Sequence, residues 1–198
     1  MTKVIGLTGG FGSGKSTVSQ LLAELGAVIL DADKVGHEAY KPKTEVWDEV
    51  VAAFGKQILT PSGEIDRQKL GQIVFNQPEA LSRLNQIMRP RMYEMMKAQI
   101  EEHQWQGVDM VVLEAAILIE ANWTSLVDEV WVTVASKAVV LERVKKQRRL
   151  EEEQILARIR SQLPTEESVK HADVAINNDG DLDELKAKVK ELWERLHA

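Results

Sequence analysis

Cysteine is absent from this chain of 198 residues, which excludes disulfide bonds and thiolate metal sites. No apolar run approaches the roughly 20 residues that a helix needs to cross a bilayer. The first apolar segment begins almost at the N-terminus, and we therefore expect no secretory signal peptide. Together these absences predict a cytoplasmic protein with no membrane partner.

Positive charge is also in short supply. Lysine and arginine number 25 against 31 aspartates and glutamates, so the formal net charge of −6 argues against a general nucleic-acid binder. The hydrophobic content of 44% and the charged content of 28% are those of a soluble globular protein. A chain of this length can bury one good core, and we expect a monomer or a weak homo-oligomer.

One glycine-rich segment stands out near the N-terminus. It fits the phosphate-binding pattern G-x-x-x-x-G-K-[ST] and runs Gly9-Gly10-Phe11-Gly12-Ser13-Gly14-Lys15-Ser16-Thr17. Residues 3–8 are predicted to form a buried strand, and residues 16–25 an amphipathic helix. Strand, glycine-rich turn and helix together aim backbone N–H groups at a polyphosphate. An ordinary glycine-rich turn is the alternative, but this context favours a site for a nucleoside triphosphate.

The residue types in this segment suit phosphate binding. The glycines permit positive φ angles and let the backbone approach the ligand. Lys15 is expected to reach the β- and γ-phosphates, and the Ser16 hydroxyl is expected to bind Mg²⁺. The residues that we predict to bind the nucleotide here are Gly10, Gly12, Ser13, Gly14, Lys15, Ser16 and Thr17.

The rest of the chain alternates strands and helices at both ends but not in the middle. Further strands are predicted at residues 27–30, 110–114, 129–134 and 173–176. Helices are predicted at residues 44–54, 66–75, 78–104, 137–162 and 182–196, the fourth being interrupted near Arg148. Pro90 is expected to end or kink the third of these helices.

Five short apolar strands separated by helices predict an α/β fold with a five-stranded parallel sheet covered on both faces. In such a sheet the ligand lies beyond the carboxyl ends of the strands. Asp31, Asp33 and Glu114 follow predicted strand ends, as the glycine-rich segment does. We expect these residues to converge on one crevice.

Two features favour a kinase over a nucleotide-operated switch. The N-K-x-D segment that a guanine-nucleotide switch needs does not occur in the sequence. The all-helical region 34–107 suits an acceptor pocket, and the charged helical pair at 137–162 suits a lid that excludes water from the phosphates. A small-molecule phosphotransferase is therefore the better interpretation.

The glycine-rich segment is followed by Asp31-Ala32-Asp33 with His37 soon after, and by distinctive segments at residues 84–90, 113–120 and 172–180. Over nearly its whole length the chain thereby resembles the dephospho-coenzyme A kinase family. The resemblance implies ATP-dependent phosphorylation of the ribose 3′-hydroxyl of dephospho-CoA, the last step of coenzyme A synthesis. It also implies three parts: a P-loop NTPase core (residues 1–33, 108–136 and 163–198), a helical CoA-binding domain (34–107) and a helical lid (137–162).

Three departures from the family pattern concern the pocket and the lid. The family usually has His-Pro where this chain has Arg89-Pro90, and arginine where Gln147 stands here. From Glu114 onward the chain has Glu-Ala-Ala-Ile-Leu-Ile-Glu, where the family usually has Asp-Val-Pro-Leu-Leu-Phe-Glu. None of the three changes the phosphate-binding segment or the Asp-x-Asp pair.

Phosphoryl transfer to an alcohol needs charge neutralisation on the transferring group and an acceptor for the hydroxyl proton. Lys15 supplies charge, and Asp33 is our candidate to orient and deprotonate the hydroxyl, with capping of the following helix as the alternative. Asp31 suits a hydrogen bond at the helix entry as well as a metal contact. Glu114 suits Mg²⁺ or its waters as well as an acceptor-site or structural carboxylate.

One arginine of the lid is expected to touch the β- or γ-phosphate. We favour Arg143, which lies one turn before Gln147 on the same helix face, over Arg148 and Arg149. Arg89 suits an acceptor phosphate, because a guanidinium forks onto phosphate oxygens, and equally suits a surface position beside the helix kink.

Two further polar residues have alternative roles. His37 suits an acceptor contact or a plain surface position. The family resemblance suggests that Asn177 contributes to the adenine pocket, and capping of the turn before Gly180 is the alternative. The five tryptophans are predicted to pack in the core or a subdomain, and they are Trp47, Trp105, Trp123, Trp131 and Trp193.

Overall fold

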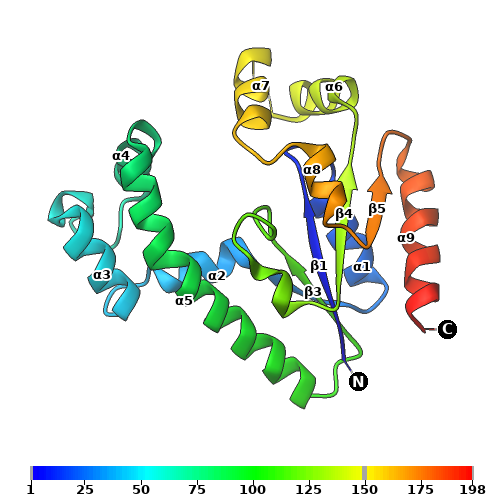
Figure 1. Cartoon of the computed structure of the whole chain (residues 1–198), viewed down its shortest axis with the longest axis horizontal. Helices are drawn as coiled ribbons and strands as arrows, with labels where there is room; N and C mark the ends of the chain where they lie inside the picture. Colours follow the sequence, from blue (N-terminus) through cyan, green and yellow to red (C-terminus); the bar gives the residue numbers. More distant parts are fainter. Residues whose placement is uncertain (1, 149–150, 198) are drawn as a thin grey trace. The chain divides into compact units, whose positions relative to one another are not determined.

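The computed structural model describes residues 2–148 and 151–197 and contains one five-stranded sheet among helices (Figure 1). The strands are β1 (Lys3–Gly9), β2 (Val28–Asp31), β3 (Met110–Glu114), β4 (Glu129–Val134) and β5 (Val174–Asn177). The α-helices are α1 (Lys15–Glu24), α2 (Ala32–Ala39), α3 (Glu45–Phe54), α4 (Arg67–Asn76), α5 (Pro78–Trp105), α6 (Lys137–Arg148), α7 (Glu152–Arg160), α8 (Thr165–Lys170) and α9 (Leu182–His197).

β1 is the central strand, and the order across the sheet is β2-β3-β1-β4-β5. β1 pairs in parallel with β3 and β4, which places Leu7 opposite Glu114 on one side and opposite Trp131 on the other. β5 pairs in parallel with β4. The predicted α/β fold with a five-stranded parallel sheet is confirmed. The loop after β1 therefore lies beside the carboxyl ends of both β3 and β4.

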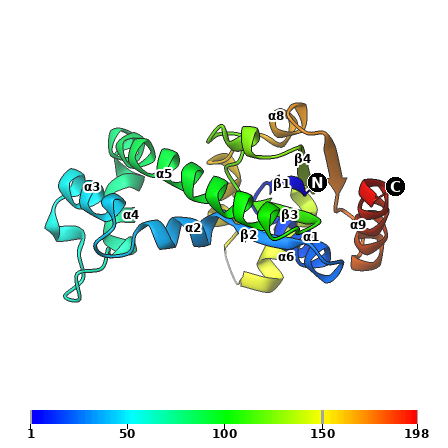
Figure 2. The same ribbon diagram turned by 90° about the horizontal axis from the view of Figure 1, so that it is seen from below.

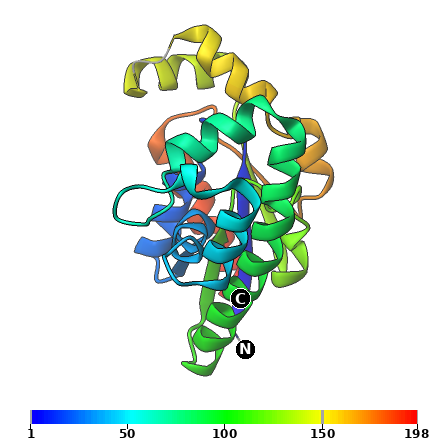
Figure 3. The same cartoon turned by 90° about the vertical axis from the view of Figure 1, so that its left-hand side faces the viewer.

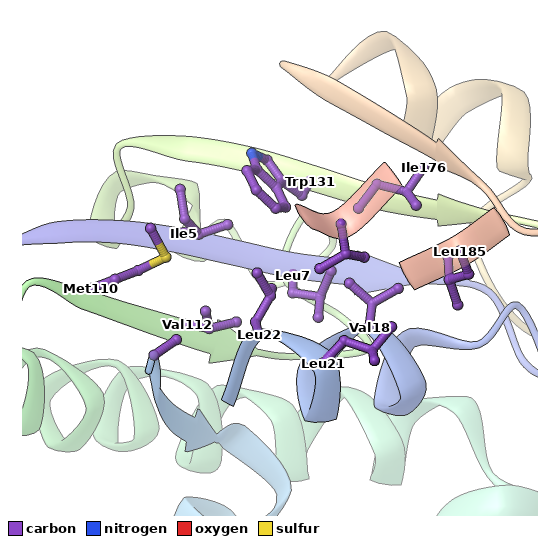
Figure 4. Packing of buried hydrophobic residues seen from close by; sticks show 12 residues of the cluster. Ile5, Leu7, Val18, Leu21, Leu22, Met110, Val112, Trp131, Ile176 and Leu185 are labelled. Atoms are coloured by element: carbon purple, nitrogen blue, oxygen red, sulfur yellow. The ribbon is translucent and has the colours of Figure 1, made fainter. Parts of the chain in front are cut away.

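One face of the sheet is covered by α1 and α9, which lie side by side (Figure 2). Ile5 and Leu7 of β1 share a buried cluster with Val18 and Leu22 of α1 (Figure 4). Burying each such side chain contributes roughly 1.5–3 kcal/mol. Gly14, which precedes α1, offers no side-chain cap, so α1 is held on the sheet by packing.

The other face of the sheet is covered by the segment that follows β3. A Cβ atom on Gly6, which alternates with Ile5 and Leu7, would lie only 2.6 Å from Leu118 Cδ2 and 3.0 Å from Val127 Cγ2. This segment includes the short 3₁₀ helix η2 (Trp123–Leu126), which contacts β1. Glycine at position 6 thus allows the close approach, and the predicted covering of both faces is confirmed.

The chain divides into two compact units, residues 1–30 with 100–198, and residues 31–99. The second unit has a core of its own, to which α3, α4 and the first half of α5 contribute. The short 3₁₀ helix η1 (Lys56–Ile58) adds Ile58, which is completely buried. The buried members of this core are Ala39, Val46, Val50, Phe54, Ile58, Ile65, Leu70, Val74, Leu84 and Met88. The helices predicted for residues 44–54, 66–75 and 78–104 are confirmed.

The structure differs from the sequence-based expectations in three places. α5 continues through Pro90, so of the two predicted outcomes, an end or a kink, the end is wrong; its buried face includes Met88 before the proline and Met96 after it. No residue range was predicted for the short helices α2 and α8. Trp105 is 91% exposed, so its predicted packing role is wrong. It is the last residue of α5, beyond the buried Ile100.

Among the described residues, no helix combines the length and the apolar character that crossing a bilayer would require.

Candidate active site

The glycine-rich segment forms a loop between Gly9 at the end of β1 and Lys15 at the start of α1 (Figure 1). Gly12 and Gly14 have φ angles of 76° and 95°, a backbone region that residues other than glycine rarely adopt. Within the described part of the chain, the N–H groups of Gly14, Lys15 and Ser16 donate to no protein acceptor. A helix N-terminus with free N–H groups is suited to bind an anion.

Three predicted site residues meet at the ends of β1 and β3. The Lys15 Nζ atom lies 2.6 Å from Glu114 Oε1, and the side chains of Lys15 and Glu114 are 17% and 13% exposed. The Ser16 hydroxyl donates to the same Glu114 oxygen at 3.1 Å. The parallel register brings Glu114 here, because β3 ends beside β1. The predicted convergence of Glu114 with the glycine-rich loop is therefore seen.

Opposing effects set the pKa of the Glu114 carboxyl group. Burial raises this pKa, whereas hydrogen bonds from Lys15, Ser19 and Ser16 and the positive charge of Lys15 lower it. The net result is a pKa below the usual value, and Glu114 is a carboxylate at neutral pH. Ser19 lies one turn after Ser16 on α1, and sequence reasoning missed it because an interior helical serine carries no motif signal.

A buried network of hydrogen bonds connects the loop to the ends of β1 and β4 and to the residue after β5. The Ser13 and Thr133 hydroxyl oxygens lie 2.6 Å apart, and the Thr133 hydroxyl donates to the Thr8 carbonyl at 3.3 Å. The Asn178 carboxamide donates to the Ser13 carbonyl at 2.8 Å. Ser13 and Thr8 come from the predicted nucleotide-binding region, whereas Thr133 and Asn178 were not predicted to contribute. Their partners lie 120 and 165 residues away in the chain, and only the folded sheet brings them together.

α6 and α7, the two helices of the predicted lid, contact each other (yellow in Figure 3), and the loop packs against them through Phe11. Phe11 joins an apolar cluster with Val140, Val144 and Ile155, and the Arg158 guanidinium carbon lies 5.2 Å from the centre of its ring. A Cβ atom on Gly12 would lie 2.8 Å from Val140 Cγ1. The two helices of the predicted lid thereby contact the phosphate-binding loop through apolar side chains.

Arg143 points to the turn after β5. Its guanidinium donates to the carbonyl oxygens of Asn178 and Gly180 at 2.6 and 2.8 Å. The predicted contact between Arg143 and a nucleotide phosphate stays a prediction. Arg149 and the side chain of Arg148, the two alternatives on the predicted lid, lie outside the residues that the structure describes.

A cavity of about 350 Å³ lies beside the loop in the same unit. The residues that line it include Gly10, Ser13, Ser136, Lys137, Pro164 and Asp179. Gln162, also in the lining, accepts a hydrogen bond of 2.6 Å from the Phe11 N–H group. The Asn177 side chain donates to Asp179 Oδ2 at 3.1 Å and accepts from the Asp179 N–H group. It thus holds the turn before Gly180, which was the alternative role for this residue.

The predicted acceptor residues Asp31, Asp33 and His37 belong to the second unit. The Asp31 carboxylate accepts hydrogen bonds from the N–H groups of Asp33 at 2.9 Å and Lys34 at 3.3 Å, so Asp31 caps α2. Asp33 is not the cap, and its side chain, like that of His37, is exposed on α2. The structure therefore assigns the capping role to the first aspartate of the Asp-x-Asp pair.

Arg89, the fourth predicted acceptor residue, lies on α5 in the second unit. It helps to line an open groove of about 550 Å³ together with Pro78, Ser82, Asn85 and Gln86. A groove that joins a guanidinium to hydroxyl and carboxamide groups is chemically suited to a phosphorylated ligand.

The glycine-rich loop, with Lys15 and Ser16 at its end, follows the central strand of a parallel sheet, and Glu114 lies at the end of the neighbouring strand β3. This arrangement is that of a P-loop kinase-type nucleotide-binding protein. The family model described as "Dephospho-CoA kinase" matches residues 3–184. The chain belongs to the dephospho-CoA kinase family.

Individual proteins agree with this assignment. The dephospho-CoA kinase of Carboxydothermus hydrogenoformans is 44% identical over 186 residues, which are 94% of this chain and 90% of that protein. A solved structure from Thermus thermophilus is 31% identical with a TM-score of 0.82, covering 98% of each chain. The dephospho-CoA kinase from Campylobacter jejuni is 25% identical with a TM-score of 0.75, covering 99% of this chain and 98% of that one.

Proposed function

We propose that the chain is an ATP-dependent kinase that phosphorylates the ribose 3′-hydroxyl of dephospho-CoA, giving coenzyme A and ADP. The observation that carries this proposal is family membership over residues 3–184, together with the Lys15–Glu114–Ser16 cluster at the phosphate-binding loop. The proposal assigns the reaction to the cytoplasm and to a monomer or weak homo-oligomer.

In the proposed site the loop binds the triphosphate of ATP. The free N–H groups at the start of α1 and the ammonium group of Lys15 neutralise phosphate charge. The loop residues proposed for this role are Gly10, Gly12, Ser13, Gly14, Lys15, Ser16 and Thr17. The neighbouring cavity of about 350 Å³, beside the turn that Asn177 holds, is proposed to take the nucleoside.

The donor set at the end of β3 fits Mg²⁺. This ion prefers hard oxygen ligands and takes only one or two from protein, the rest being water and phosphate oxygens. The Ser16 hydroxyl and the Glu114 carboxylate supply two such oxygens 3.1 Å apart, and we propose that they hold the ion or its waters. When bound, the ion would neutralise charge on the transferring phosphoryl group.

Transfer is proposed to proceed by attack of the acceptor oxygen on the γ-phosphorus. The new P–O bond forms as the bond to the β-phosphate oxygen breaks, and ADP leaves with that electron pair. The hydroxyl proton passes to the Asp33 carboxylate, which the structure leaves exposed and free of the capping role. Asp31, His37 and Arg89 are proposed to bind the acceptor, and Arg143 to stabilise the transferred group.

A coupled assay of ADP release tests the function. The rival acceptors are dephospho-CoA, simple nucleoside monophosphates, adenosine and water, and dephospho-CoA is expected to support the fastest turnover by far. Lys15→Ala is the negative control and is expected to lose at least ~10³-fold in turnover, because it removes charge from the transferring phosphate. Turnover with water alone would reject the kinase and favour a regulatory NTPase.

A further inference from the structure

Asn178, the first residue after β5, is a buried amide whose role is not explained by the roles assigned above. The residue is only 6% exposed. Its main chain is fixed on both sides, because its N–H donates to the Val134 carbonyl at 2.7 Å and its carbonyl accepts from Arg143 at 2.6 Å. Its carboxamide donates to the Ser13 carbonyl at 2.8 Å. A rigid support therefore holds one particular carbonyl of the phosphate-binding loop.

The fit between Asn178 and the loop is tight. A Cβ atom built on Gly14 would lie 2.0 Å from the Asn178 Nδ2 atom, which is far inside van der Waals contact. Gly14 also has a φ angle of 95°, so a side chain is excluded there by both space and backbone geometry. The carboxamide thus fills the place that a side chain at position 14 would take.

The hydrogen bond to Ser13 has a consequence for the next N–H group. The Ser13–Gly14 peptide is trans, as are all peptide bonds in the described residues, and in a trans peptide the C=O and N–H groups point in opposite directions. Because Asn178 draws the Ser13 carbonyl to the buried side, the Gly14 N–H must face the other way. That N–H has no acceptor among the described residues, and it stands at the start of α1.

A peptide group next to glycine needs a hydrogen-bond partner that fixes its orientation. Glycine adopts positive and negative φ angles with similar ease, so the Ser13–Gly14 peptide could rotate at low cost without a partner for its carbonyl. Rotation would turn a carbonyl oxygen toward the phosphates and replace an attractive contact by a repulsive one.

We propose that Asn178 is a positioning residue that holds the Ser13–Gly14 peptide with its N–H directed at the nucleotide phosphates. The inference rests on the proposed function, since it takes the loop to be the phosphate site. It predicts that loss of the Asn178 donor weakens binding of the phosphates and leaves binding of the nucleoside unchanged.

Two variants and three ligands test this. Asn178→Asp keeps the shape but replaces the donor by an oxygen, and Asn178→Ala removes the donor without adding charge. Gln20→Glu adds the same charge as Asn178→Asp at an exposed position of α1 and is the matched control. Calorimetric titration with ADP, inorganic pyrophosphate and adenosine, all with Mg²⁺, gives the dissociation constants, and circular dichroism checks the fold.

In both variants the dissociation constants of ADP and pyrophosphate are expected to rise by about 10- to 100-fold, the usual worth of a hydrogen bond to a charged group. The adenosine constant and the Gln20→Glu protein are expected to stay near wild type. Unchanged ADP affinity in a folded variant, or an equal loss for adenosine, would overturn the inference.

A second measurement needs no variant. In the ¹⁵N-labelled wild-type protein, the Gly14 amide proton is expected to shift downfield when pyrophosphate or ADP binds, as a new hydrogen bond requires. A Gly14 resonance that does not move on saturation would reject the inference even if both variants fail to fold. A wild-type protein that binds ADP but transfers nothing to dephospho-CoA would instead reject the proposed function, leaving the role of Asn178 to be judged by these affinities.

Discussion

Asp33 and Asp31 are two residues apart, yet their surroundings in the structure differ. Asp31 caps α2 with two hydrogen bonds, and Asp33 is exposed one position into the helix. Asp33→Asn is therefore expected to leave the free energy of unfolding nearly unchanged while turnover falls by ~10²–10⁴-fold, because the proton acceptor is lost.

Turnover under saturating substrates and urea unfolding together check this prediction. Asp31→Ala is the contrasting variant, expected to cost about 1 kcal/mol of stability through the lost cap. Glu38→Gln, an exposed carboxylate on the same helix, is the control that should keep wild-type turnover. A folded Asp33→Asn protein with wild-type turnover would show that Asp33 is not the base.

Glu114 makes the stability of the protein depend on pH. Its pKa is lower in the folded protein than in the unfolded chain, where the pKa of a glutamate is about 4.3. The ionised carboxylate therefore stabilises the fold above that pH, and this contribution is lost as the pH falls through the folded-state pKa. At pH 7, Glu114→Gln is expected to reduce the free energy of unfolding by roughly 1–3 kcal/mol, since Lys15 loses a charged partner.

Urea unfolding of the wild-type and Glu114→Gln proteins at pH 7 and pH 4 measures this effect. The difference in unfolding free energy between the two proteins should shrink at the lower pH, because protonation of Glu114 weakens the same interactions that the substitution removes. A difference that does not change with pH would mean that the ionisation of Glu114 does not contribute to stability.

At the residue level the sequence predicted motifs well and buried partners poorly. Lys15, Ser16 and Glu114 were predicted from a pattern and a strand end, and the structure brings them together. Thr133 and Asn178 carry no such signal, because a threonine in a strand and a second asparagine in a turn are ordinary choices. Their contacts with the loop depend on the register between strands that are far apart in sequence.

At the level of elements, all five strands were predictable because each is a short, mainly apolar run between helical segments, although only β1, β3 and β4 are largely buried. α2 was expected only as the helix that an aspartate would cap, without bounds, because its eight residues follow β2 with no intervening turn signal. α8 was missed because six residues span less than two turns. An end or a kink of α5 was expected at Pro90; the helix does not end there, because tertiary packing of its apolar face outweighs the single lost N–H.

α6 carries the lid arginine that we propose for catalysis. Arg143→Ala is expected to lower turnover sharply, while Arg148→Ala and Arg149→Ala each cost little. ADP release by the three single variants under saturating substrates makes the comparison. If Arg148→Ala or Arg149→Ala proves more damaging, the assignment to Arg143 is wrong.

The contacts of Arg143 add a second readout to this experiment. In the structure its guanidinium donates to the Asn178 and Gly180 carbonyls, so Arg143→Ala also removes support from the turn after β5. A direct phosphate contact in the transition state would lower kcat with little change in ADP affinity. A supporting role alone would weaken ADP binding and lower Tm. Arg143→Lys keeps the charge but not the planar, forked guanidinium. In either case it should therefore recover little of the turnover, ADP affinity or Tm that Arg143→Ala loses.

At the level of the whole molecule, the proposed site residues are divided between two compact units. The phosphate-binding loop, Glu114 and the 350 Å³ cavity belong to the first unit, and Asp33, His37 and the groove beside Arg89 belong to the second. The predicted domain boundaries, with residues 34–107 as the acceptor domain and 137–162 as a lid, follow from the family resemblance and stay a prediction. The nucleotide and the acceptor should therefore protect different segments of the chain from hydrogen exchange.

Hydrogen exchange measured by mass spectrometry shows which segments each ligand protects. ADP with Mg²⁺ is expected to slow exchange in the loop between β1 and α1 and in residues 134–137, because binding a ligand opposes local opening of the segments that hold it. Dephospho-CoA alone is expected to slow exchange in α2 and around Arg89 on α5, and to leave the loop between β1 and α1 unchanged. Adenosine serves as the control for the nucleoside cavity. Protection by dephospho-CoA confined to the first unit would show that residues 34–107 are not the acceptor domain, and the roles proposed for His37 and Arg89 would be withdrawn with it.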